Sequence, residues 1–242
     1  MNKVTTAVIM AAGLGTRFGK RTETMPKGFI PVGGKPMIVR SIETLISCGI
    51  TRIIIGTGFG KEYYEALAEK YPGTECCFSP RFAETNSMYT LYNCRKAIGD
   101  SAFILLESDI IFNRTAIDDI LNDQHPDIML ITPVTKFQDQ YYVAYDGSGF
   151  LANCLTEQDS IQANGELVGI HKLSSCFYKK MCEDYSEKVD SLPKLGYEYE
   201  LLHMSRHILP LYVLKSTGTR WYEIDDEQDL KYAEDTIVPY LD

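Results

Sequence analysis

One apolar segment and the loop that follows it constrain the fold of this chain more than any other feature. Residues 4–10 are mostly apolar and pass directly into Ala11-Ala12-Gly13-Leu14-Gly15-Thr16-Arg17, and Pro26-Lys27 follows nine residues later. A strand that ends in such a loop exposes backbone N–H groups without bulky side chains over them, which suits a polyphosphate. Arg17 and Lys27 can add fixed positive charge. The pattern predicts a phosphate-binding loop at the end of a buried first strand.

Three other interpretations of these glycines imply different functions or none. The simplest is a strand-to-loop turn whose glycines only supply positive φ angles. A P-loop needs G-x-x-x-x-G-K-[ST], and the sequence contains no such string. A dinucleotide-binding fingerprint needs a helix that begins within the glycines and an acidic residue after the second strand. Prolines and glycines over residues 26–36 prevent that helix, and the second predicted strand ends at Gly56-Thr57-Gly58, so a dehydrogenase remains a remote alternative.

Charge is unevenly distributed along the 242 residues. The chain has 24 Lys and Arg against 33 Asp and Glu, a net charge of −9. Residues 1–40 nevertheless hold seven basic groups and one acidic group, which leaves the other 202 residues at −15. The overall acidity argues against nucleic acid as a partner, because a phosphate backbone requires a basic face. A cationic segment on an acidic protein instead favours a small anionic ligand.

The sequence has no feature typical of a membrane or secreted protein. No stretch approaches the roughly 18 apolar residues of a transmembrane helix, and the first residues are typical of a strand rather than of a signal peptide. The seven cysteines are odd in number and contain no C-x-x-C pair, which argues against a disulfide framework or a zinc site. We therefore expect a cytoplasmic protein with reduced thiols and no membrane partner.

Strand-like and helix-like segments alternate through the first half of the chain, as in βαβ units that build a parallel sheet. The apolar patterns predict strands over 4–10, 52–56, 75–78, 102–106 and 128–132, and helices over 37–48, 62–71, 86–97 and 114–122. After Pro133 they predict antiparallel strands over 141–145, 150–156 and 166–172, helices over 174–189 and 197–206, a last strand pair over 209–215 and 221–224, and a closing helix over 226–240. We expect a single α/β domain over residues 1–242.

Together these motifs resemble a known family, the nucleoside-triphosphate transferases that make sugar nucleotides and CDP-alcohols. Its opening signature is an apolar strand, A-A-G-x-G-x-R, P-K and a short G-K-P turn, which here is Gly34-Lys35-Pro36. Other segments are similar to those of the small phosphonate and phosphocholine cytidylyltransferases, namely residues 26–29, 86–92, 107–109, 165–170, 196–199 and 222–226. The resemblance implies a Rossmann-like, mainly parallel mixed sheet flanked by helices, of the nucleotide-diphospho-sugar transferase type. It also implies a nucleotide-binding part over 1–133 and a partly antiparallel acceptor-binding part over 134–242.

The resemblance also implies roles for individual residues. Arg17 and Lys27 are the expected catalytic residues, with Lys27 bridging CTP and the attacking acceptor, and Asp109 and Asp225 are expected to share a Mg²⁺ ion. The related pattern often has Asp-x-Asp where this chain has Glu107-Ser108-Asp109, so metal ligation is assigned to Asp109. Glu107 is placed among the nucleotide-binding residues, and whether it also binds the metal stays open. The expected nucleotide-binding residues are Ala11, Ala12, Gly13, Gly15, Thr16, Arg17, Ser87 and Glu107.

Each of these residues also has a purely structural interpretation. Asp109 could cap the loop after its strand, and Ser87 could merely begin its helix. The acids over 225–227 could favour a helix dipole and supply an N-cap, and we assign the cap to Asp226 so that Asp225 is left for the metal. We expect the four histidines to be ordinary surface or packing residues.

The acceptor is the least determined part of the prediction. Tyr141, Glu166 and Glu198 lie in segments expected to face the cleft, and with Lys27 they form the predicted acceptor-binding set. Carboxylates suit a primary amine, whereas an aromatic cage suits a quaternary ammonium. We predict a Mg²⁺-dependent cytidylyltransferase that joins CTP to a small phosphonate, with 2-aminoethylphosphonate as the first choice. Phosphocholine, a sugar 1-phosphate and a non-catalytic nucleotide sensor stay open as alternatives, and so does a homodimer.

Overall fold

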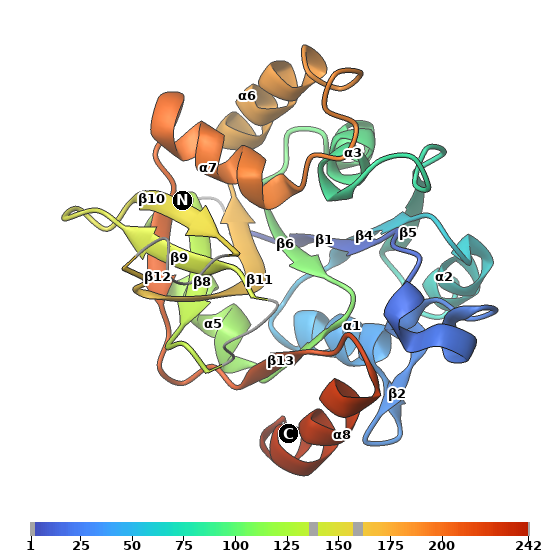
Figure 1. The fold of residues 1–242 in the computed structure, drawn as a ribbon. Coiled ribbons are helices and arrows are strands. Elements are labelled where there is room, and N and C mark those ends of the chain that lie inside the picture. The colour runs from blue at the N-terminus through green and yellow to red at the C-terminus, as the bar shows by residue number, and fades with distance from the viewer. Residues whose placement is uncertain (1–2, 136–139, 157–161, 242) are drawn as a thin grey trace.

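The structure is a computed structural model that describes residues 3–135, 140–156 and 162–241. A nine-stranded mixed sheet forms its centre (Figure 1). Its strands are β1 (Thr6–Ala11), β4 (Arg52–Thr57), β5 (Thr74–Phe78), β6 (Phe103–Glu107), β8 (Ile128–Thr132), β9 (Tyr142–Tyr145), β10 (Leu151–Leu155), β11 (Gly165–Leu173) and β12 (Tyr212–Lys215). The main order is β10-β9-β11-β6-β1-β4-β5, and β8 pairs with β11 and β12. Strands β6, β1, β4 and β5 run parallel, whereas β11, β9 and β10 form an antiparallel part. The predicted mixed α/β fold is confirmed.

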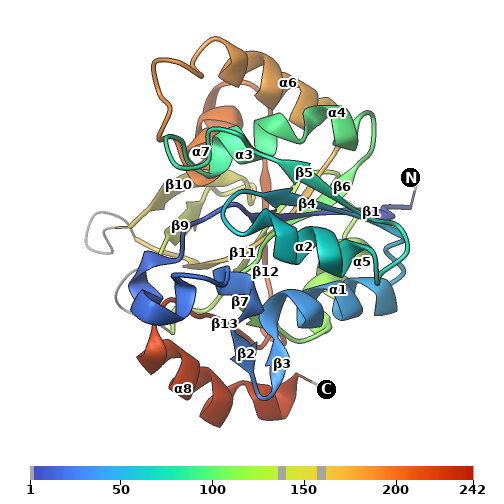
Figure 2. The ribbon, with the colours of Figure 1, turned by 90° about the vertical axis from the view of Figure 1, so that its right-hand side faces the viewer.

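Helices cover both faces of this sheet (Figure 2). On one face lie α1 (Met37–Ser47), α2 (Lys61–Ala68) and α5 (Thr115–Asn122), and on the other lie α3 (Ser87–Asn93), α4 (Arg95–Ile98), α6 (Ser175–Ser186) and α7 (Tyr197–His207). The chain closes with α8 (Glu227–Thr236) and a 3₁₀ turn, η4 (Val238–Tyr240), while η1 (Thr16–Thr22) and η2 (Lys27–Phe29) follow β1. Within the described ranges, no helix is long and apolar enough to cross a membrane.

The central strands are apolar along their whole length because both of their faces are buried. Alternate side chains point to opposite faces. Val8 and Leu105 pack in a core beneath α3, α6 and α7, whereas Ile9 and Leu106 pack in a second core against α1, α2 and α5. Because both faces of these strands are buried, their sequences are continuous apolar runs and do not alternate between apolar and polar residues.

The predicted pairing of the last two strands is wrong. β12 instead runs parallel to β8, and β13 (Trp221–Glu223) pairs antiparallel with β7 (Ile110–Phe112), a strand that the sequence patterns did not predict. Between β12 and β13, Oγ of Ser216 donates to Oδ2 of Asp119 (2.5 Å) and accepts from the backbone N–H of Thr219 (3.1 Å). These bonds turn the chain away from β12 and towards β7. The predicted helix over 86–97 divides at Cys94 into α3 and α4.

The ends of β1 and β6 lie side by side, and this places the site. Met10 is the register partner of Glu107, and the backbone N–H of Ser108 donates to the carbonyl of Met10 (3.1 Å). The N–H of Ile224, just after β13, donates to the carbonyl of Asp109 (3.0 Å). The glycine loop, the Glu107-Ser108-Asp109 segment and the start of α8 therefore meet at one edge of the sheet. A short hairpin, β2 (Pro31–Val32) with β3 (Lys35–Pro36), lies beside α8 (Figure 2).

Candidate active site

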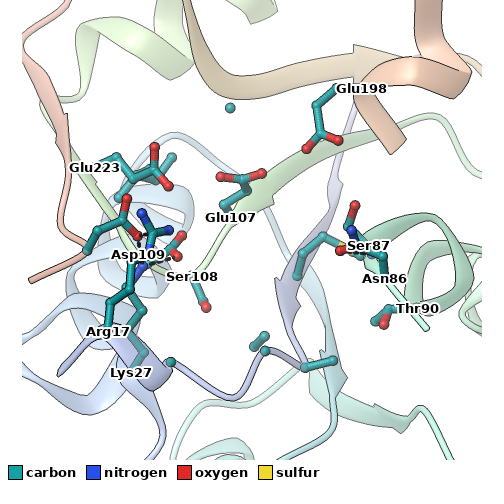
Figure 3. Close-up of a pocket in the computed structure, with 18 of the residues that line it drawn as sticks. Arg17, Lys27, Asn86, Ser87, Thr90, Glu107, Ser108, Asp109, Glu198 and Glu223 are labelled. Atoms are coloured by element: carbon teal, nitrogen blue, oxygen red, sulfur yellow. Dashed lines mark hydrogen bonds and ion pairs between the residues drawn. The ribbon is translucent and has the colours of Figure 1, made fainter. Parts of the chain in front are cut away.

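A cleft of about 470 Å³ opens at the carboxyl ends of β1 and β6 (Figure 3). Every predicted site residue lines it except Glu166: Ala11, Ala12, Gly13, Gly15, Thr16, Arg17, Lys27, Ser87, Glu107, Asp109, Tyr141, Glu198 and Asp225. These residues come from both parts of the chain, on either side of residue 133. The structure thus gathers residues that are more than two hundred positions apart in the sequence.

The glycine loop has the backbone shape that its sequence predicts. Gly15 has φ +62°, and a Cβ atom there would lie 3.0 Å from Cβ of Lys27 and 3.3 Å from Cγ2 of Thr22. Thr22 also donates from Oγ1 to the carbonyl of Gly15 (2.7 Å), which ties the loop to η1. Around Gly13 a Cβ would meet nothing within 4 Å, so this part of the loop is open. A bulky anion can approach the backbone here.

Two cations and two carboxylates form an ion-pair network on one wall of the cleft. Nζ of Lys27 lies 2.6 Å from Oδ2 of Asp109 and 2.5 Å from Oδ1 of Asp225, and Nη2 of Arg17 lies 2.6 Å from the same Asp225 oxygen. Burial lowers the pKa of Lys27, but the charges and hydrogen bonds of the two aspartates outweigh burial and hold its pKa above the ordinary value. Lys27 is therefore a fixed positive charge between two carboxylates.

Three carboxylates form a second group, which we call the acid trio: Glu107, Asp109 and Glu223. Each offers one oxygen, and these oxygens lie within 4.8 Å of one another. Burial and the charges of Asp109, Glu223 and Glu198 raise the pKa of Glu107. Burial likewise raises the pKa of Glu198, to about 7. Carboxylate oxygens at this spacing suit a hard divalent cation such as Mg²⁺, so the donor set fits the predicted metal.

Asp225, a predicted metal ligand, is placed differently from the trio. Its side chain is 4% exposed, and Lys27 and Arg17 hold one of its oxygens. Asp109 belongs to both groups, since it pairs with Lys27 and also contributes to the trio. The Lys27 ammonium thus lies between the two carboxylates that the sequence assigned to the metal.

The opposite wall of the cleft begins at α3. The side chain of Asn86 accepts from the N–H of Ser87 (2.8 Å) and caps the helix. Ser87 is the first residue of α3, and its Oγ accepts from the N–H of Tyr197 (3.0 Å), which ties α3 to α7. Asn86 and Thr90 line the cleft beside Ser87. They flank the face that the sequence assigned to the base or ribose.

Glu166 does not belong to this cleft. Its buried carboxylate accepts from the N–H of Thr135 (2.9 Å) and from Oγ1 of the same residue (2.6 Å). In strand β11 the register shifts between Leu167 and His171, and Gly169 has φ +76° in this stretch. The irregular stretch brings Leu167, Val168 and Gly169, and not Glu166, to the cleft. Glu166 therefore does not lie where it could contact an acceptor in this cleft, contrary to the role that the sequence assigned to it.

The assignment of the helix cap to Asp226 is confirmed. Its Oδ1 accepts from the N–H of Gln228 (2.8 Å) and of Asp229 (2.9 Å). Asp225, one residue earlier, points into the cleft instead. His171 is fully buried without a hydrogen-bond partner for either ring nitrogen, as expected for a packing residue.

Sequence reasoning missed Glu223 and several other lining residues. Glu223 lies two residues before Asp225, just as Glu107 lies two residues before Asp109. That shared spacing was a usable signal, because residues two apart in an extended chain point to the same side. Other lining residues have no local signal, since tertiary packing alone brings them to the cleft: Tyr64, Phe82, Thr85, Gln140, Gly169 and Trp221.

The model of the MobA-like NTP transferase domain matches residues 7–175 of this chain. The 2-aminoethylphosphonate cytidylyltransferase of Lancefieldella rimae is 36% identical over 109 residues, which are 45% of this chain and 44% of that protein. The choline-phosphate cytidylyltransferase of Streptococcus pneumoniae is 42% identical over 98 residues, which are 40% of this chain and 42% of that protein. Each match thus spans less than half of the relative's own length.

The fold also matches a solved structure over nearly its whole length. The structure of CTP:phosphocholine cytidylyltransferase from Streptococcus pneumoniae superposes with a TM-score of 0.82 and 24% sequence identity. The superposition covers 96% of this chain and 98% of that one. At this level of identity the likeness establishes the fold.

Proposed function

The chain belongs to the family of MobA-like NTP transferase domains, and from that premise we propose that it is a cytidylyltransferase that joins CTP to 2-aminoethylphosphonate. The observation that carries the proposal is the single cleft in which the glycine loop, Lys27 and Arg17 face the carboxylates of Asp109 and Asp225. The names of the two matching relatives support the choice of CTP and of a small phosphonate or phosphate ester.

The proposed reaction needs positioning and charge more than a strong base. An oxygen of the phosphonate attacks the α-phosphorus of CTP, the bond from that phosphorus to the bridging oxygen breaks, and pyrophosphate leaves. The acceptor is largely dianionic near pH 7, since its second pKa is about 6, so it can attack without losing a proton. The main obstacle is the repulsion between two anions. Lys27 lies where it can contact both, and Arg17 adds charge towards the triphosphate, which stabilises the transition state.

We propose that Asp109 is the central ligand of a Mg²⁺ ion and that Asp225 completes the predicted pair. Glu107 and Glu223 stand beside Asp109 as further oxygen donors. When bound, the ion would neutralise charge on the α-phosphate and the departing pyrophosphate. For Asp225 to contribute, the Lys27 ammonium must leave the space between the two aspartates, and an incoming phosphate offers it a new partner.

We assign residues 1–133 to the nucleotide and residues 134–242 to the acceptor. The lining contributed by the second part includes the polar and acidic side chains of Gln140, Tyr141 and Glu198, beside apolar ones from Leu167, Val168 and Trp221. Glu198 is buried, and an ammonium group would stabilise its charged form. This arrangement favours the amine of an aminophosphonate.

Phosphocholine is the second candidate acceptor. The relative from Streptococcus pneumoniae supports it, and the ring of Tyr141 packs edge-on against that of Tyr199, with centroids 5.7 Å apart. The ring of Tyr141, which lines the cleft, could face a quaternary ammonium. An acidic and an aromatic group thus both line the cleft. A comparison of turnover with the two acceptors is needed to decide between them.

An acceptor panel tests the proposal. The protein is incubated with CTP, Mg²⁺ and either 2-aminoethylphosphonate, 2-hydroxyethylphosphonate, phosphocholine or glucose 1-phosphate, and kcat/KM is measured from pyrophosphate release. We expect the aminophosphonate to be the best substrate. A higher kcat/KM with phosphocholine or the sugar phosphate would overturn the acceptor assignment, and CTP binding without pyrophosphate release would indicate a nucleotide sensor.

Two buried glutamates give a matched pair of variants for the same assay. Glu198→Gln removes a charge from the cleft, whereas Glu166→Gln removes one that binds Thr135 outside it. We expect Glu198→Gln to reduce the preference for the amino over the hydroxyl phosphonate about tenfold, because a charge-assisted hydrogen bond is worth roughly 1.5–3 kcal/mol. Glu166→Gln should leave that preference unchanged. An unchanged preference in Glu198→Gln would remove this residue from amine recognition.

A further inference from the structure

A seam of hydrogen bonds joins the start of α3 to the segment that leads into α7. Asn86 donates from its backbone N–H to the carbonyl of Pro193 (3.1 Å) and from Nδ2 to the carbonyl of Lys194 (3.2 Å). The N–H of Met88 donates to the carbonyl of Leu195 (3.3 Å), and the N–H of Tyr197 donates to Oγ of Ser87 (3.0 Å). The seam connects the wall assigned to the nucleotide with the helix that carries Glu198. The seam therefore ties the two walls of the cleft to each other.

Tyr197 lies at the inner end of this seam and contacts three elements at once. It is the first residue of α7 and is fully buried. Its N–H holds Ser87 on α3, and its ring packs edge-on against His171 on β11, with centroids 5.4 Å apart. Its hydroxyl donates to Oε1 of Glu107 at the end of β6 (2.8 Å). The backbone N–H, the ring and the hydroxyl of Tyr197 thus each make a different contact.

The carboxylate of Glu107 is confined on two sides. The hydroxyl of Tyr197 holds Oε1, and Gly169 lies so close that a Cβ atom there would be 3.3 Å from Oε2. In the view of Figure 3, Glu107 lies between the other two carboxylates of the acid trio and Glu198. The orientation of this carboxylate is therefore set by its neighbours before any ligand arrives.

We propose that Tyr197 is a positioning residue of the active site, which fixes the carboxylate of Glu107 relative to the nucleotide-side helix α3. The inference rests on the proposed function. The backbone N–H and the ring of Tyr197 explain its structural contacts with α3 and β11, and a phenylalanine could make both. Only the hydroxyl reaches Glu107. The hydroxyl thus aligns the acid trio, and such indirect partners of a metal ligand typically change metal affinity about 10–100-fold when removed.

The test compares two buried tyrosines that each lose only a hydroxyl. Tyr197→Phe removes the bond to Glu107, and the control Tyr178→Phe removes an equally buried bond to the carbonyl of Leu91 (2.6 Å), outside the cleft. Mn²⁺ binding is titrated by electron paramagnetic resonance in the presence of the α,β-methylene analogue of CTP, which cannot react. The melting temperature of each variant and its KM and kcat at several metal concentrations complete the set.

We expect Tyr197→Phe to bind Mn²⁺ at least about tenfold more weakly than the wild type. Its kcat should fall at limiting metal and recover when metal is in excess, while KM for CTP stays close to the wild-type value because Ser87 keeps its contact. Tyr178→Phe should lose a similar amount of thermal stability but retain wild-type metal affinity.

Three results would overturn the inference. Wild-type Mn²⁺ affinity in Tyr197→Phe, or an equal loss in Tyr178→Phe, would make the Tyr197 hydroxyl a structural group only, and the proposed function would be unaffected. A wild-type protein that binds neither Mn²⁺ nor the CTP analogue would overturn this inference and the proposed function together.

Discussion

Lys27 is the residue on which the proposed chemistry depends most. Its side chain is 11% exposed and its ammonium lies between two carboxylates, which it can exchange for phosphate oxygens. We expect Lys27→Met to lower kcat about 10²–10³-fold, the usual effect of removing one group that stabilises transition-state charge. Pyrophosphate release measures the effect.

The control for this variant is an exposed lysine. Lys61 pairs with Glu65 across one turn of α2 (3.3 Å) and lies outside the cleft. Lys61→Met should leave kcat unchanged, because exposed pairs of this kind contribute little. If Lys27→Met kept wild-type turnover, the proposed mechanism would be wrong.

Gly169 provides a second prediction for a single residue. Its φ of +76° and its distance to Glu107 make alanine both strained and crowded. We expect Gly169→Ala to lose about 1–2 kcal/mol of unfolding free energy and most of its activity. Gly99→Ala is the control, since φ there is +59° but a Cβ would meet nothing within 4 Å. That variant should lose stability and keep its activity. Equal activity in both variants would show that crowding of Glu107 has no consequence.

Among the helices, α8 gives the clearest prediction because its cap is a single side chain. Asp226 accepts two backbone N–H groups, from Gln228 and Asp229. Asp226→Ala should lower the free energy of unfolding by about 1 kcal/mol, whereas Asp226→Asn keeps an acceptor oxygen and should lose less. Urea unfolding compares the three proteins. Equal stability of the alanine variant and the wild type would contradict the capping role.

The elements that local pattern could predict are those with a local cause. Strands such as β1 and β6 are long apolar runs, and helix α1 has the spacing of one buried face and ends before Gly49, whose φ is +89°. β7 has only three residues, and its partner β13 lies more than a hundred residues later. No window of sequence contains that pairing. The same limit applies to the site, where the register of β11 decides that Glu166 lies outside the cleft.

Across the whole molecule, the uneven charge of the sequence becomes an arrangement in space. Arg17 and Lys27 from the basic first 40 residues meet Asp109 and Asp225 from the acidic remainder in one network. The net charge of −9 therefore does not describe the site, where positive and negative side chains are paired. The motifs predicted these four residues well, because each follows a strand or lies in the glycine-rich segment.

Acid stability is a property of the whole fold and depends on His171. Burial lowers the pKa of His171 from 6.5 to about 3, so the folded protein keeps this ring neutral while the unfolded chain protonates it. Stability is then fully present above pH 6.5 and falls as the pH drops towards 3. Between pH 7 and pH 5 this histidine should cost the wild type about 2 kcal/mol, from 1.36 kcal/mol per pKa unit.

The measurement is urea unfolding at pH 7 and pH 5. His171→Phe should lose about 2 kcal/mol less than the wild type over this interval, even if its stability at pH 7 is reduced by altered packing. An identical loss in His171→Phe and the wild type would show that this ring is protonated in the fold.

The central claim is that this cleft joins a nucleotide to an acceptor through a new P–O–P bond. Phosphorus NMR of a mixture of the protein, CTP, Mg²⁺ and 2-aminoethylphosphonate tests it directly. The account predicts that the phosphonate signal is replaced by two coupled signals of a CMP–phosphonate anhydride, together with one equivalent of pyrophosphate. A phosphonate signal that stays unchanged while CTP is intact, or while it is hydrolysed to CMP, would contradict the account.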